Sequence, residues 1–127
     1  RMINHIDADY YIAQPEGYEL DSRITKNAKI TYNQSEALEN ADFVYAKNWA
    51  SYSNYGQILK TDNEWMLTKE KMKITNNAKF MHCLPVRRNI IVSDEVLDNK
   101  NSLVIQQANN RTFAAQSVIK ILIDGIS

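Results

Sequence analysis

Short apolar runs alternate with segments of mixed polarity along the chain. The runs at residues 10–13, 29–32, 42–46, 78–83 and 102–106 predict five strands, and the first three of them are rich in β-branched or aromatic residues. After Asp42, residues 43–46 are apolar or aromatic at successive positions, which is typical of a strand covered on both faces. Strands that alternate with helices predict an α/β fold with a Rossmann-like, mostly parallel sheet and helices on both of its faces.

The segments between these runs predict the helices. Asn33, with Glu36 three residues later, forms a capping-box pattern that indicates a helix ending near residue 40. Ser93 is followed by two acidic residues. This pattern predicts the N-cap and the acidic first turn of another helix. Further helices are predicted at residues 21–28, 63–72 and 111–124, and a structured loop is predicted at residues 48–59.

The last predicted helix, at residues 111–124, is apolar around most of its circumference. Its polar stripe recurs every four residues, at Thr112, Gln116, Lys120 and Asp124. We expect such a helix to be covered on more than one side. Gly125 follows it as a stop signal.

Composition narrows the classes of protein to consider. The 127 residues are 44% hydrophobic and 24% charged, which fits one globular domain. Because 15 basic residues balance 15 acidic ones, we expect no overall attraction to nucleic acid or to an anionic membrane. No membrane span or signal peptide is expected, and the single cysteine, Cys83, fits a cytoplasmic protein. The glycines at 17, 56 and 125 are too scattered for the Gly-x-Gly-x-x-Gly turn of a dinucleotide-binding domain.

Chemically useful side chains follow three of the predicted strands. In open parallel sheets, ligands bind beyond the carboxyl ends of the strands. Lys47 follows the third predicted strand, and Cys83 and Leu84 close the fourth. Arg111 lies shortly after the fifth strand. Two cations, a thiol and free backbone groups are therefore expected at one edge of the sheet, and they predict a site for an anion.

Each of these residues also has an ordinary structural interpretation. A lone cysteine such as Cys83 is more often an inert buried thiol, and a lone lysine such as Lys47 is more often a solvated surface residue. His82 is expected on the opposite face of its strand from Cys83 and is interpreted as structural. At least one of Arg87 and Arg88 is expected in a surface ion pair.

Arg111 and the aromatic residues of the predicted loop can also be interpreted either as functional or as structural residues. Arg111 is expected in the first turn of its helix, where the helix dipole disfavours a cation, and that local cost favours an anionic ligand. Trp49, Tyr52 and Tyr55 could stack on nucleic acid bases, but loop packing is favoured because no basic stripe surrounds them.

Several motifs occur in a specific order. His-Cys-Leu-Pro at residues 82–85 is followed by Arg-Arg-Asn at 87–89 and by Ala-Asn-Asn-Arg at 108–111. Together with residues 15–20, 45–50 and 55–59, these blocks resemble the aspartate/ornithine carbamoyltransferase family. The resemblance runs from residue 10 to residue 124 and is to the C-terminal, ornithine-binding domain. It implies a substrate-binding domain over residues 1–127.

At a few positions this chain differs from the ornithine and aspartate enzymes of the family. These differences indicate that it resembles the branch that acts on N-acylated ornithine. Ornithine enzymes carry Ser-Met-Gly where this chain has Ala46, Lys47 and Asn48, and aspartate enzymes have proline in place of Cys83. Acetylornithine enzymes can carry a modifiable lysine at the place of residues 90–91, which are both isoleucine here. The resemblance therefore favours succinylornithine as the substrate. An acetylornithine or ornithine enzyme remains an alternative, and so does a non-catalytic module that binds small anions.

The resemblance implies a reaction and a set of contacts. In the family, the side-chain amine of ornithine attacks the carbonyl carbon of carbamoyl phosphate, without a metal or an organic cofactor, in arginine biosynthesis. Cys83, Leu84 and Arg111 match the residues that contact carbamoyl phosphate, Leu84 through its backbone carbonyl. Lys47 and Arg87 match the cations that bind the carboxylates of the N-acylated substrate.

The resemblance also implies missing parts. The Ser-x-Arg-Thr run of the family's carbamoyl phosphate domain is not in this sequence. The family's ornithine-binding domain begins one strand earlier, so the domain is expected to lack its first strand and a partner domain. We expect negligible activity from these 127 residues alone, and a cytoplasmic homotrimer for the full-length enzyme.

Overall fold

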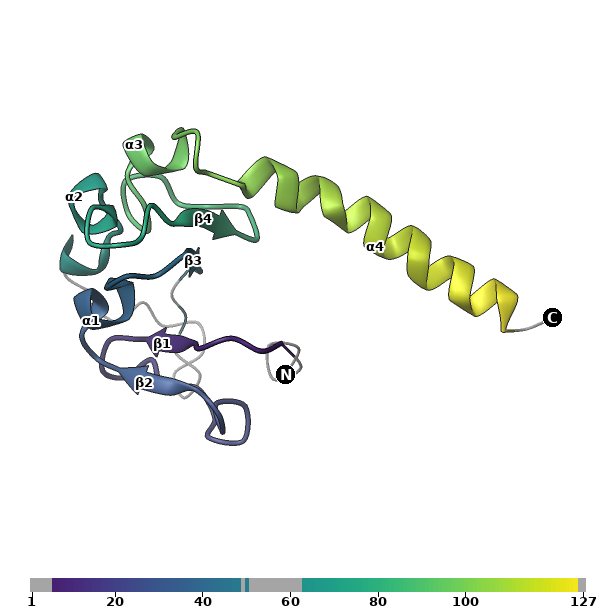
Figure 1. The fold of residues 1–127 in the computed structure, drawn as a ribbon, viewed down its shortest axis with the longest axis horizontal. Helices are drawn as coiled ribbons and strands as arrows, with labels where there is room; N and C mark the ends of the chain where they lie inside the picture. The colour runs from purple at the N-terminus through teal and green to yellow at the C-terminus, as the bar shows by residue number, and fades with distance from the viewer. Residues whose placement is uncertain (1–5, 49, 51–62, 126–127) are drawn as a thin grey trace.

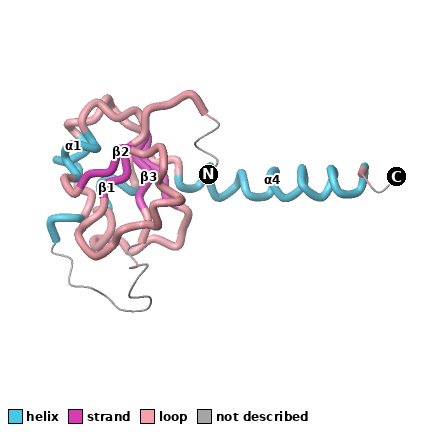
Figure 2. The backbone as a smooth tube through the Cα atoms, turned by 90° about the horizontal axis from the view of Figure 1, so that it is seen from below, coloured by secondary structure: helices cyan, strands magenta, loops and turns pink. Residues whose placement is uncertain are grey.

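The computed structural model describes residues 6–48, 50 and 63–125. Four short strands and several helices form a compact body, and one long helix leaves it (Figures 1 and 2). In chain order the elements are β1 (Tyr11–Ala13), β2 (Lys29–Thr31), α1 (Gln34–Leu38), β3 (Phe43–Ala46), a 3₁₀ helix (Asn63–Trp65), α2 (Lys69–Met72), β4 (Lys79–His82), α3 (Asp94–Leu97) and α4 (Val104–Asp124).

The strands form two parallel pairs. In the first pair, Tyr11 of β1 lies opposite Lys29 of β2. In the second pair, Ala46 of β3 lies opposite His82 of β4. The predicted parallel α/β arrangement is therefore confirmed, whereas the described residues form two two-stranded sheets and not one five-stranded sheet.

A cavity separates the two sheets. Its volume is about 520 Å³, and every residue of β1 and of β3 lines it. Each of these strands pairs with its sheet neighbour on one edge only within the described part of the chain. The inner edges of the two parallel pairs thus border the same space.

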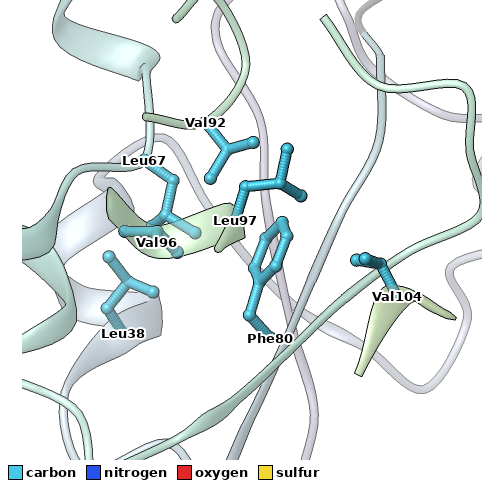
Figure 3. Close-up of a cluster of buried hydrophobic side chains, with 7 residues drawn as sticks. All are labelled: Leu38, Leu67, Phe80, Val92, Val96, Leu97 and Val104. Carbon is cyan, nitrogen blue, oxygen red and sulfur yellow. The ribbon is translucent and has the colours of Figure 1, made fainter. Parts of the chain in front are cut away.

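The hydrophobic core lies on one face of the β3–β4 pair. Val44 and Ala46 point to this face and pack against the core, whereas Phe43 and Tyr45 point to the other face and are more than half exposed. The sequence predicted that this strand, β3, is covered on both faces. Among the described residues only one of its faces is covered. The buried cluster consists of Leu38, Leu67, Phe80, Val92, Val96, Leu97 and Val104 (Figure 3).

The helix predicted at residues 21–28 is replaced by turns. The Asp21 carboxylate accepts a hydrogen bond from the backbone N–H of Arg23 at 2.8 Å, and the Arg23 side chain donates to the same carboxylate. The backbone bonds that follow, Ile24 N–H to Asp21 O and Ala28 N–H to Thr25 O, span three residues each. The side chain of Asp21 has taken over a bond that a helix would need, as aspartate often does.

The helix predicted at residues 63–72 is split by Leu67. The backbone N–H of Leu67 donates to Ile91 O, and its carbonyl accepts from the N–H of Ser93, both at 2.9 Å. These long-range bonds require an extended backbone at Leu67, so a helix cannot pass through it. The α2 helix then begins after Thr68, whose hydroxyl accepts from the N–H of Lys71.

The fifth strand, predicted at residues 102–106, is wrong. Ser102 makes a single bridge to Phe80, and the N–H of Leu103 donates to Phe80 O at 2.8 Å. The chain then enters α4, where the N–H of Gln107 donates to Leu103 O at 2.8 Å. Gln106, Gln107 and Ala108 favour a helix once the strand pairing stops after one bridge.

The α4 helix projects from the body as a rod (Figures 1 and 2). Val104 is its one buried residue, and residues 109–125 are all exposed. The apolar side chains lie around the helix as the sequence predicts. However, no other described segment packs against them, so the expected burial of α4 is not found among the described residues. The large exposed apolar side chains on α4 are Ile105, Phe113, Val118, Ile119, Ile121, Leu122 and Ile123.

Among the residues that the structure describes, no helix combines the length and apolar character that crossing a bilayer requires.

We expect the isolated 127-residue chain to self-associate through α4, because burial of its apolar side chains releases about 25 cal/mol per Å². Size-exclusion chromatography with light scattering is expected to give a mass that exceeds 14.7 kDa and rises with concentration. The double variant Ile121→Lys with Leu122→Lys is expected to shift the chain toward the monomer.

A matched control places the same two charges on the polar stripe of α4, as Thr112→Lys with Gln116→Lys. This variant is expected to associate like the parent. A parent chain that stays monomeric at every concentration would contradict the prediction, and so would equal effects of the two double variants.

Candidate functional site

Lys47 and Cys83 leave neighbouring strands at the same edge. Because Ala46 lies opposite His82 in the parallel β3–β4 pair, the residues that follow these two also lie side by side. Both Lys47 and Cys83 are exposed. The sequence prediction that these two residues share the carboxyl edge of the sheet is therefore confirmed, and the alternative of a buried, inert Cys83 thiol is wrong.

His82 is buried directly beneath this edge. Its side chain is 1% exposed, and it lies on the core face of β4, opposite to the side from which Cys83 projects. Burial lowers the pKa of the His82 imidazole below its ordinary value, and the positive charge of Lys47 lowers it further. The ring is therefore neutral near pH 7, and the charge of Lys47 acts on the space around it.

The His82 ring also bonds the segment that follows β4. Its Nδ1 accepts a hydrogen bond from the backbone N–H of Leu84 at 2.9 Å. Its Nε2 is buried and has no hydrogen-bond partner among the described residues. Because a neutral imidazole carries one proton, acceptance at Nδ1 places that proton on Nε2.

The Cys83–Leu84 segment is held from a second side. The Asn48 side-chain Nδ2 donates to Pro85 O at 3.0 Å, so the residue after Lys47 is tied to the residue after Leu84. Leu84 has a φ of 51° and precedes a cis peptide bond. A left-handed conformation is unfavourable for a leucine, so surrounding contacts must stabilise it. Sequence reasoning missed the role of Asn48, which only its place beside Lys47 could have suggested.

Arg88 is the ion-pair member of the Arg87–Arg88 pair. Its guanidinium donates to Asp94 at 2.6 Å and to Asp98 at 2.7 and 2.8 Å. Arg88 lowers the pKa of both carboxyls, chiefly through these hydrogen bonds. Asn89 makes two more bonds to Asp94: its side-chain Nδ2 donates to the carboxylate, and its Oδ1 accepts from the backbone N–H of Asp94.

Arg87 keeps an exposed side chain while its backbone is fixed. Its carbonyl accepts from the N–H of Ile91 at 3.0 Å, which closes the turn that carries it. No ion pair of Arg87 is found in the described part of the chain. The division of the pair into one structural arginine and one available arginine agrees with the sequence prediction.

Arg111 is not joined to this edge. It was expected after a fifth strand, at the start of a helix, but α4 begins seven residues earlier at Val104. Gln107 donates to the Tyr45 hydroxyl at 3.1 Å and anchors the first turn of α4 to β3. Arg111 lies one turn farther out, roughly 6 Å along the helix axis, and is exposed. The described residues therefore place Lys47 and Cys83 together and leave Arg111 on the projecting helix.

Other candidate residues add little to this edge. Trp49, Tyr52 and Tyr55 lie outside the described residues, as does most of the structured loop predicted at residues 48–59. Within the described residues, no group of three or more His, Cys, Asp or Glu side chains could hold a metal ion. The edge itself offers one cation, Lys47, together with a thiol and a fixed backbone segment, and a lysine ammonium can bind carboxylate and other anionic oxygens.

The chain matches one protein family along nearly its whole length. The model described as "Aspartate/ornithine carbamoyltransferase, Asp/Orn binding domain" matches residues 1–122. N-succinylornithine carbamoyltransferase of Bacteroides thetaiotaomicron is 53% identical over 98% of this chain and 40% of its own length. The enzyme of the same name from Bacteroides fragilis is 51% identical over the same shares. Ornithine carbamoyltransferase of Thermococcus kodakarensis is 31% identical over 95% of this chain and 43% of its own length.

Solved structures agree with these relatives. A mutant of N-acetyl-L-ornithine transcarbamylase, complexed with carbamyl phosphate and N-succinyl-L-norvaline, superposes with a TM-score of 0.76 at 29% identity. That match covers 87% of this chain and 39% of the other. Acetylornithine transcarbamylase complexed with acetylcitrulline gives a TM-score of 0.74 at 30% identity, over 81% and 36% of the two chains. The chain therefore spans about 40% of the length of the relatives it matches.

We expect the imidazole of His82 to titrate below its ordinary pKa of 6.5, because burial and Lys47 both disfavour the protonated form. The stability that neutral His82 contributes is then fully present above pH 6.5 and is lost as the pH falls from there through the lowered pKa. NMR titration of the histidine signals measures this pKa, and the spectrum of His82→Asn identifies which signal belongs to His82. A His82 pKa at or above 6.5 would contradict the burial of the ring.

Proposed function

The chain belongs to the aspartate/ornithine carbamoyltransferase family, and we propose on that premise that it is the amino-acid-binding part of an N-succinylornithine carbamoyltransferase. The observation that carries the proposal is the identity of 53% to an N-succinylornithine enzyme, against 31% to an ornithine enzyme and 32% to an N-acetylornithine enzyme. The N-acetylornithine and ornithine activities are the alternatives within the family.

The reaction that we propose is a carbamoyl transfer. The side-chain amine of N-succinylornithine attacks the carbonyl carbon of carbamoyl phosphate, a C–N bond forms, and the C–O bond to phosphate breaks. The amine loses a proton and phosphate leaves. Catalysis of this kind depends on orientation of the two substrates and on stabilisation of charge at the carbonyl and the leaving phosphate.

Lys47 and Arg87 bind the carboxylates of the acylated substrate in this proposal. N-succinylornithine has two carboxylates, and its α-nitrogen is an uncharged amide, so cations suit its fixed charges. The exposed Lys47 side chain at the sheet edge and the exposed Arg87 side chain on its fixed turn support this assignment. The related transcarbamylase complexed with N-succinyl-L-norvaline supports it as well, because that compound keeps both carboxylates and lacks only the reacting amine.

Cys83, Leu84 and Arg111 contact carbamoyl phosphate in this proposal. The support for Cys83 and Leu84 is their place beside Lys47 at the end of β4, on a segment fixed by two hydrogen bonds. The support for Arg111 is the Ala-Asn-Asn-Arg motif alone, because the described structure leaves this side chain on α4.

We also propose that the functional protein contains parts beyond these residues. The cavity between β1 and β3 suits one further parallel strand, which would join the two pairs into a single sheet with spacings of about 4.8 Å. A carbamoyl phosphate domain, absent from residues 1–127, would supply further ligands for the phosphate. The assembled enzyme would be a cytoplasmic homotrimer.

Replacement of Lys47 by methionine tests the substrate assignment in the full-length protein that carries this chain. Loss of one charge-assisted bond is expected to raise KM for N-succinylornithine about 10- to 150-fold, with a smaller effect on ornithine. Steady-state assays with ornithine, N-acetylornithine and N-succinylornithine measure both effects. Lys73→Met, which removes an exposed lysine at the end of α2, is the matched control and is expected to change neither. A parent enzyme that prefers unmodified ornithine would overturn the assignment of Lys47.

The isolated 127 residues are expected to show no measurable turnover of carbamoyl phosphate with N-succinylornithine, whereas the full-length protein is expected to be active. The physical reason is that the described residues offer two exposed cations, Lys47 and Arg87, for the amino-acid substrate, whereas the phosphate of carbamoyl phosphate would need further ligands. Citrulline-type product formation, assayed for both proteins, is the measurement. Binding of N-succinylornithine without turnover by the full-length protein would favour a non-catalytic anion-binding module instead.

A further inference from the structure

We infer that His82 is a positioning residue, whose Nδ1 holds the backbone of Leu84 in the conformation that presents Cys83 and Leu84 to the carbamoyl group. This inference rests on the proposed function for its catalytic consequence. The hydrogen bond from the Leu84 N–H to the His82 ring, on which the inference is built, does not depend on that function.

The segment after β4 needs an external constraint. Leu84 has a positive φ of 51°, in a region where its Cβ is crowded against the backbone. Its N–H cannot continue the β3–β4 pairing, which ends at His82. The hydrogen bond to His82 Nδ1 satisfies this N–H inside the protein, so the strained backbone and its compensating contact occur at the same residue.

The histidine ring is itself fixed. It is 1% exposed on the core face of β4, two residues after the fully buried Phe80. A ring with no freedom to rotate is a rigid acceptor, whereas a solvent-exposed side chain would not fix the position of a backbone amide. The bond therefore transmits the rigidity of the core to the exposed Cys83.

The unpartnered Nε2 indicates that the ring has more than a packing role. A buried donor without a partner is costly, and native structures contain few of them. An apolar side chain of similar volume would fill the same space without that cost. If Nδ1 must accept the Leu84 N–H, the single proton of the neutral ring has to lie on Nε2. The unpaired Nε2–H is then the consequence of keeping Nδ1 as an acceptor. Burial of the ring, and then the charge of Lys47, lower the pKa of His82 and so favour the neutral ring.

The test compares His82→Asn with His82→Gln in the full-length enzyme. An asparagine side chain commonly accepts a hydrogen bond from the backbone N–H two residues ahead, so it replaces the Nδ1 acceptor. Glutamine places its amide nearer to the position of Nε2 and leaves the Leu84 N–H unpaired. We expect His82→Asn to keep kcat within about threefold and His82→Gln to lower kcat about 10- to 100-fold, with KM for N-succinylornithine changed less than threefold in both.

Equal losses in the two variants, or retention of kcat in both, would overturn the inference, since a packing role does not distinguish the two amides in this way. A change confined to KM would overturn it as well. The neutral tautomer of His82 in the parent protein gives a readout that does not depend on folding of the variants. Nitrogen NMR with labelled histidine is expected to show a protonated Nε2 and an unprotonated Nδ1, and a protonated Nδ1 would refute the hydrogen bond.

Failure of the proposed function is distinguishable from failure of this inference. A full-length protein without carbamoyltransferase activity would remove the proposed function, while the tautomer of His82 would still show whether the ring accepts the Leu84 N–H. An active enzyme with the opposite tautomer would keep the function and remove the positioning role.

Discussion

The parallel pairing of β3 with β4 is the constraint on which the candidate site depends. Its register places Ala46 opposite His82, and this fixes which residues leave the sheet together. Lys47 and Cys83 follow as neighbours at one edge, and the buried face of the same pair carries the core. A shift of one residue would turn His82 outward and bury Cys83, so one pairing determines both the stability of the core and the chemistry of the edge.

Sequence reasoning predicted the parts of the fold that local chemistry determines. The four strands found at β1 to β4 lie inside predicted runs, and Asn33 caps α1 through its side chain as expected. The errors lie where a contact distant in sequence, or a side chain bonded to its own backbone, decides the conformation. Leu67 breaks a predicted helix because it bonds residues 91 and 93 across the core, and no periodicity near residue 67 records those partners. The strand expected at residues 102–106 lacks a partner beyond one bridge, and intrinsic helix propensity then prevails.

The site was predictable to the extent that strand order alone determines it. The carboxyl ends of parallel strands meet at one edge, so Lys47 and Cys83 could be placed together from the sequence. The roles of Arg87 and Arg88 could not be separated by spacing, because the difference lies in Asp94 and Asp98, which the fold brings to Arg88. His82 was correctly predicted to lie on the opposite face of its strand from Cys83, yet its bond to Leu84 requires a backbone conformation that no sequence pattern shows. Arg111 was predicted from the same reasoning as Lys47, and its placement differs because the fifth strand is not present.

Charge balance is the physical basis of our expectation that this edge alone does not suffice for the proposed carbamoyl transfer. N-succinylornithine brings two carboxylates, and Lys47 with Arg87 can neutralise those two charges. Carbamoyl phosphate adds a phosphate group, and the cation proposed to contact it, Arg111, stays on the projecting helix in the described structure. A transferring phosphate in a desolvated site requires several cationic or backbone N–H donors. The cavity between β1 and β3 and the exposed apolar side chains of α4 are two separate surfaces that the described residues leave without cover. In the proposed reaction, the further phosphate ligands would come from groups beyond this edge.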